Sequence, residues 1–225
     1  MKPATDTPTA AVPCGSCAEM PATAGEILVA GVYAAVDEAA GREIARLKRE
    51  EGIVPSCRRG CSGCCCGQHI QTNALEAHVL GRFIKRTFSP RQIEGLKRRT
   101  HAWHLTDEAR RGRPGDAIIH EEYLPSDTLC CPMLVEQVCS AYQVRPVICR
   151  THYVSSNPSA CQPPNGRHPA GDAPVTLTSI IEATSPLADA LRAGIETTGC
   201  DYSRSIMLLP HWLAIELGWD LSEPG

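Results

Sequence analysis

Aromatic residues are scarce in this sequence, at 4% of 225 positions. A hydrophobic core must therefore be built mainly from Leu, Ile, Val and Ala, and such a core suits packed helices. A chain of this length buries enough apolar surface to fold as one domain without covalent cross-links.

The sequence also lacks an excess of charge and a long apolar segment. Its 25 acidic and 22 basic residues leave a net charge of −3, which gives no electrostatic basis for binding nucleic acid or an anionic membrane. The longest charge-free apolar run, Ile27–Val36, is far shorter than the roughly 20 residues that a membrane span needs. The N-terminus has no signal-peptide core. We therefore predict a cytoplasmic protein with no membrane or nucleic-acid partner.

Cysteine, in contrast, is abundant, with 13 residues. Without a secretion signal these thiols should stay reduced, and clusters of reduced cysteines most often bind a metal. Disulfides are the alternative. The first group lies in CRRGCSGCCC (57–66), and about 65 residues further on the second group comprises Cys130, Cys131, Cys139, Cys149 and Cys161.

Helical periodicity surrounds these two groups. A helix is predicted from Thr23 to a stop at Gly52 and Pro55, and others begin after caps at Asn73 and Ser89. Further helices are predicted at roughly 176–184, 186–197 and 204–217, and the last of them should bend or restart at Pro210. The second cysteine group reads as irregular structure with one short hairpin within 134–142. The predicted fold is mainly α, with a flexible leader (1–22) and one domain (23–220) whose helices pack around a cysteine-rich insert.

The first cysteine group has the spacing of a metal site. Glycines 60 and 63 allow a tight turn that would direct Cys61 and Cys64 at one ion, and Cys57 is close enough to join them. Neighbouring side chains point in different directions, so Cys64 and Cys65 should not bind the same ion. Either only one of them is a ligand, or the two serve different metals.

The two groups together resemble the YkgJ-like cysteine-cluster family, described as chelating zinc or iron. The resemblance covers residues 50–165. Its motifs are Cys57-x3-Cys61-x2-Cys64-Cys65 with Glu76 in the following helix, then Cys131-Pro-Met-Leu134, Cys139-x2-Tyr142, Arg145-Pro146, Cys149-Arg150 and a later Cys161.

The resemblance implies eight metal ligands: Cys57, Cys61, Cys64, Cys65, Cys131, Cys139, Cys149 and Cys161. Eight thiolates exceed the four that a structural zinc ion takes, so two zinc sites, an iron–sulfur cluster or another multinuclear iron site would use them better. Arg145 and Arg150 are expected to offset the negative charge around the ligands. The roles of Cys14, Cys17, Cys66, Cys130 and Cys200 are not assigned.

Three functions fit these observations. The first is binding of zinc or iron for structure, storage or delivery. The second is a metal-dependent enzyme that modifies a peptide or protein, for example by methylation, because the resembling family includes flagellin lysine methylases; no catalytic residue is assigned. The third is a zinc-stabilised module for a protein or peptide partner. His69 and His152 are each a candidate ligand or proton carrier, although a structural role is favoured for both.

The spacing Cys57-x3-Cys61-x2-Cys64 also equals the three-cysteine motif of radical S-adenosylmethionine enzymes. Those enzymes place the motif in a large α/β barrel, which needs a strand–helix alternation that this sequence lacks. The match therefore supports only an iron–sulfur cluster as one candidate cofactor.

Overall fold

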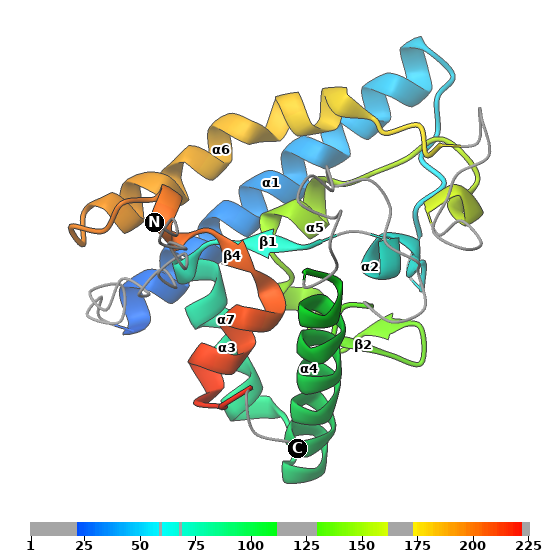
Figure 1. Cartoon of the computed structure of the whole chain (residues 1–225). Coiled ribbons are helices and arrows are strands. Elements are labelled where there is room, and N and C mark those ends of the chain that lie inside the picture. Colours follow the sequence, from blue (N-terminus) through cyan, green and yellow to red (C-terminus); the bar gives the residue numbers. More distant parts are fainter. Residues whose placement is uncertain (1–21, 59, 68, 112–129, 162–172, 222–225) are drawn as a thin grey trace, which may run out of the picture.

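The computed structural model describes residues 22–58, 60–67, 69–111, 130–161 and 173–221 (Figure 1). The predicted leader, including Cys14 and Cys17, lies outside this part of the chain apart from its last residue. The described elements are mainly α-helices with two short antiparallel strand pairs, which confirms the predicted fold class. None of the described helices combines the length and the apolar character needed to cross a membrane.

Two long helices lie side by side along one face of the molecule, α1 (Ala22–Glu50) and α6 (Thr178–Glu196) (Figure 1). The core between them is aliphatic, as predicted, and includes the fully buried Val29, Val36 and Leu191. The end of α1 also follows the prediction. Gly52 has a φ of 69°, and the N–H of the next residue donates a hydrogen bond back to the Leu47 carbonyl at 3.2 Å, as in a glycine C-cap.

The predicted break in α6 is wrong, because the helix continues through Pro186. Proline lacks the N–H that would bond to the carbonyl four residues earlier. That carbonyl belongs to Glu182, and the Ser185 hydroxyl donates to it at 3.3 Å. Together with packing against α1, this bond compensates for part of the loss.

A second layer contains α3 (Ala74–Thr87), α4 (Pro90–Arg111) and α7 (Leu209–Leu217), which share a core of Leu80, Ile84, Leu96 and Leu213. Both predicted N-caps are present. The Asn73 side chain accepts the Glu76 N–H at 3.0 Å, and the Gln92 side chain accepts the Ser89 N–H at 2.8 Å.

The last helix begins at Leu209, next to the predicted restart at Pro210, and the residues from 204 to 208 are not part of it because they form other structure. A 3-10 turn covers Ser203–Ser205, and β4 (Met207–Leu208) then pairs antiparallel with β1 (Gln71–Thr72). Pro210 therefore lies in the first turn of α7, where its missing N–H costs nothing.

The cysteine-rich insert lies at one side of these layers (Figure 1). It contains α2 (Gly63–Gly67), β2 (Leu134–Val135), β3 (Val138–Cys139), a 3-10 turn (Tyr142–Val144), α5 (Val147–Thr151) and a second 3-10 turn (Pro158–Cys161). The predicted hairpin is confirmed as the β2–β3 pair. Its two turn residues, Glu136 and Gln137, both have positive φ, as a two-residue type I′ turn requires.

Candidate metal centre

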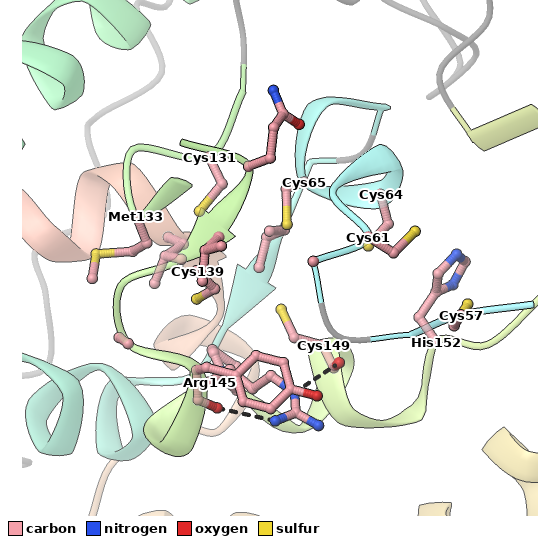
Figure 2. A pocket seen from close by; sticks show the side chains of 18 of the residues that line it. Cys57, Cys61, Cys64, Cys65, Cys131, Met133, Cys139, Arg145, Cys149 and His152 are labelled. Atoms are coloured by element: carbon pink, nitrogen blue, oxygen red, sulfur yellow. Dashed lines mark hydrogen bonds between the residues drawn. The ribbon is translucent and has the colours of Figure 1, made fainter. Parts of the chain in front are cut away.

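All eight predicted ligands are free thiols in the structure. Seven of them line one cavity of about 320 Å³, and the exception is Cys161. Cys161 packs directly beside this cavity, because its Cβ would lie only 2.7 Å from a methyl group at Gly63. The tertiary structure thus brings together thiols from the first cysteine group, the hairpin with the segment before it, and α5 (Figure 2). Cys161 adds a thiol from the 158–161 turn.

A tight turn forms in the first group, but it is closed between Arg58 and Cys61 and not between Cys61 and Cys64 as predicted, and the two glycines serve different purposes. Gly60 has a φ of 86°, and the Cys61 N–H donates to the Arg58 carbonyl at 2.9 Å. Gly63 begins α2 and does not have positive φ. It leaves room for Cys161, which any larger side chain would displace.

The unassigned Cys66 and Cys130 form a disulfide with each other. The expectation that all cysteines stay reduced is therefore wrong for this pair, and Cys200 is also disulfide-bonded. The reason is local geometry. Successive residues of a helix are rotated by about 100°, so Cys66 in α2 points in a different direction from Cys64 and Cys65 and meets Cys130.

Backbone contacts hold the two cysteine groups against each other. The Cys131 N–H donates to the Cys65 carbonyl at 2.6 Å, immediately beside the Cys66–Cys130 disulfide. On the other side of α2, the Val154 N–H donates to the Cys57 sulfur at 3.4 Å. The two cysteine groups are therefore joined at two points by contacts within the protein itself.

Glu76 links the helical layers to the second cysteine group. Its carboxylate is only 4% exposed and accepts hydrogen bonds from the Asn73 amide at 2.7 Å, the Thr72 hydroxyl at 3.1 Å and the Val147 N–H at 2.7 Å. Val147 begins α5, the helix that carries Cys149. Burial raises the pKa of Glu76. The acid of the resembling motif is therefore a structural link between α3 and α5.

The two arginines expected near the ligands lie in different places, and only one of them lines the cavity. Arg145 lines the cavity, with its guanidinium stacked 3.9 Å from the centre of the Tyr142 ring, and donates to the Cys149 carbonyl at 3.3 Å. Arg150 is not among the cavity residues. It is 3% exposed and bonds to Asp37 of α1 at 2.5 Å, which attaches α5 to that helix.

Arg99, which belongs to none of the sequence motifs, lies beside the second cysteine group. Its Nε donates to the Pro132 carbonyl at 2.7 Å, and its charge lowers the pKa of the Cys131 thiol against the larger effect of burial. The contact arises because α4 passes close to the segment before β2. Local sequence does not reveal this contact, because the two segments are 30 residues apart.

The thiols differ strongly in their affinity for protons. The pKa of Cys64 is lowered to about 7, chiefly because the Cys65 side chain hydrogen-bonds to it, and the same bond raises the pKa of Cys65. Burial raises the pKa of Cys131 to about 12 and that of Cys161 to about 11, and it raises the pKa of Cys149 well above its ordinary value. Metal ligation needs thiolates, so loading this site would release several protons.

The candidate histidines occupy different places. His152 lines the cavity near Cys57, and burial lowers its pKa, which favours the neutral ring (Figure 2). His69 packs edge-on against Trp103, with ring centres 6.3 Å apart. Within the described residues, no three or more His, Cys, Asp or Glu side chains are already arranged as a set that could hold a metal ion. The thiols share a cavity but do not form a closed ligand cage.

The chain matches no family model, no curated protein and no solved structure. The resemblance to the YkgJ-like family thus stays a prediction from the motifs. Function has to be argued from the residues of the cavity.

Proposed function

We propose that this protein binds zinc or iron through its two cysteine groups. The observation that carries the proposal is the convergence of seven free thiols on one cavity, with the eighth packed beside it. Thiolate sulfur is the preferred ligand for both zinc and iron–sulfur clusters.

Thiols are suitable ligands for zinc and iron, but these thiols would have to move closer together to bind an ion. Because no three ligands are already gathered in the described part of the chain, binding would have to draw the thiols inward across the cavity. The ligands come from short elements and turns, which can shift more easily than the long helices. Metal binding and local folding should therefore be coupled.

Anaerobic purification followed by metal analysis and a visible spectrum tests the proposal. A brown protein would contain an iron–sulfur cluster, and a colourless one with about two zinc ions per chain would contain two tetrathiolate sites. Cys61→Ser should lower the bound metal and the thermal stability. The matched control is Cys66→Ser with Cys130→Ser, which removes two neighbouring cysteines that are not proposed ligands and should keep the metal.

Two results would contradict metal binding. One is a wild-type chain that contains no zinc or iron even after anaerobic reconstitution. The other is a Cys61→Ser chain whose metal content equals that of the wild type, which would refute the ligand assignment.

A metal-dependent enzyme is the second candidate, and the shape of the cavity favours it. One wall consists of apolar side chains that cannot bind a metal, among them Ile70, Leu80 and Leu209. A cavity of about 320 Å³ is within the usual size range of small-molecule sites. Replacing the metal with Co²⁺ tests for an open coordination position, because added azide should then change the visible spectrum. An unchanged spectrum would favour a closed, structural site.

A further inference from the structure

We propose that the eight cysteines form two separate four-thiolate centres, divided between the adjacent residues Cys64 and Cys65. This inference rests on the proposed metal binding and adds which thiols act together. The first centre comprises Cys57, Cys61, Cys64 and Cys161. The second centre comprises Cys65, Cys131, Cys139 and Cys149.

The division begins in α2, which presents three consecutive cysteines in three directions. A rotation of about 100° per residue separates Cys64, Cys65 and Cys66 around the helix. Cys66 meets Cys130 in a disulfide, and the Cys65 carbonyl accepts the Cys131 N–H. Cys64 follows Gly63, against which Cys161 packs. Each of the three thus has a different neighbour from the later part of the chain.

The first centre gathers on the side of α2 that faces the 158–161 turn. Figure 2 shows Cys57, Cys61 and Cys64 on the same side of the cavity, with His152 beside Cys57. Cys57 is held there by the Val154 N–H. Cys161 joins them from the 158–161 turn, because it packs against Gly63, the residue before Cys64.

The second centre gathers between α2, the hairpin and α5. Figure 2 shows Cys131, Cys139 and Cys149 around the space that Cys65 enters. All four residues line the cavity, and the Cys131 N–H donates to the Cys65 carbonyl at 2.6 Å. Cys139 lies in β3 and Cys149 in α5, so different elements fix the two ligands.

Cys64 is adjacent to both centres, because its neighbour in the chain, Cys65, belongs to the second one. Its place in the first centre follows from its position on the side of Cys57 and Cys61 in Figure 2 and from the contact between Gly63 and Cys161. Four thiolates around a divalent ion leave a local charge of about −2. Arg145 lines the same cavity, so its cation can offset part of the negative charge of both centres.

Zinc titration of the reduced, metal-free chain against a chromophoric chelator tests this division. The wild type should bind two zinc ions tightly. Cys161→Ser and Cys139→Ser should each weaken one ion at least tenfold and leave the other unchanged. The double variant of Cys161 and Cys139 should lose both ions. The double variant of Cys57 and Cys161 should lose only the ion of the first centre. Substitution with ¹¹³Cd gives a second readout, since one of two NMR resonances should disappear in each single variant while the other reports that the chain is folded.

The outcomes separate the division from metal binding itself. Equal losses in the two double variants would overturn the division and indicate one shared site, while metal binding would stand. Disappearance of both ¹¹³Cd resonances in the Cys161→Ser chain would overturn the division in the same way. A wild type that binds neither zinc nor iron would refute both proposals.

Discussion

Replacing Glu76 with alanine should destabilise the whole fold and the thiol cavity together. The carboxylate is buried, caps α3 through Asn73 and receives the N–H of Val147 at the start of α5. Cys149 is two residues further along α5. Loss of the carboxylate therefore removes its hydrogen bond to Asn73, the N-cap of α3, and its hydrogen bond to α5, the helix that carries the proposed ligand Cys149.

The magnitude follows from the donors left behind. Alanine leaves the Asn73 amide and the Val147 N–H without their acceptor, and each orphaned buried donor costs about 1–3 kcal/mol. The Thr72 hydroxyl also loses its acceptor, but a hydroxyl can rotate toward another one. Against this, the variant no longer buries a carboxyl whose pKa is raised by desolvation, which offsets part of the loss. The net loss in the free energy of unfolding should be about 3 kcal/mol. Glu76→Gln keeps the shape and one acceptor oxygen, so it should lose only about 1 kcal/mol.

Urea denaturation followed by circular dichroism measures these losses. With an m-value of about 3 kcal/mol/M for a chain of this size, the midpoint of the alanine variant should fall by about 1 M and that of the glutamine variant by about a third of that. The alanine variant should also retain less metal after dialysis. The reasoning is refuted if both variants unfold within about 0.2 M of the wild type, or if the glutamine variant is the less stable of the two.

Two other predictions concern the cysteines. Cys66→Ala with Cys130→Ala opens a loop that spans 64 residues, which should cost about 4 kcal/mol in urea denaturation under oxidising conditions. A reducing agent also breaks the Cys200 disulfide in both chains, so it should remove the difference in stability between the wild type and the double variant. In the metal-free chain, Cys64 should be the fastest thiol to react with iodoacetamide at pH 7, and its rate should fall only as the pH drops below its pKa of about 7. Cys65→Ala removes the hydrogen bond, so the Cys64 pKa should return toward 9 and its rate at pH 7 should fall by roughly 50-fold, as peptide mass mapping would show; an unchanged rate would contradict the hydrogen bond.

The sequence alone determined the helical class, the caps at Asn73 and Ser89, the stop at Gly52 and the hairpin within 134–142. Each depends on residues a few positions apart, so local chemistry decides it. The break at Pro186 was mispredicted because proline normally ends a helix, and neither the Ser185 bond nor the packing against α1 is visible as a local pattern. The restart of the last helix at Pro210 was predicted, but the strand before it was not, because β4 forms only when Gln71 and Thr72 lie beside it.

The spacing and the motifs also predicted which thiols would be candidate ligands, and the same eight cysteines are free in the structure. Only the tertiary structure decided their partners. It paired Cys66 with Cys130, turned Arg150 toward Asp37 and brought Arg99 to the second cysteine group. These contacts join residues that are 30 or more positions apart, and their geometry depends on how α1, α4 and α5 pack. Short-range spacing can thus predict the donor atoms, whereas the packing of distant elements determines which donors face each other.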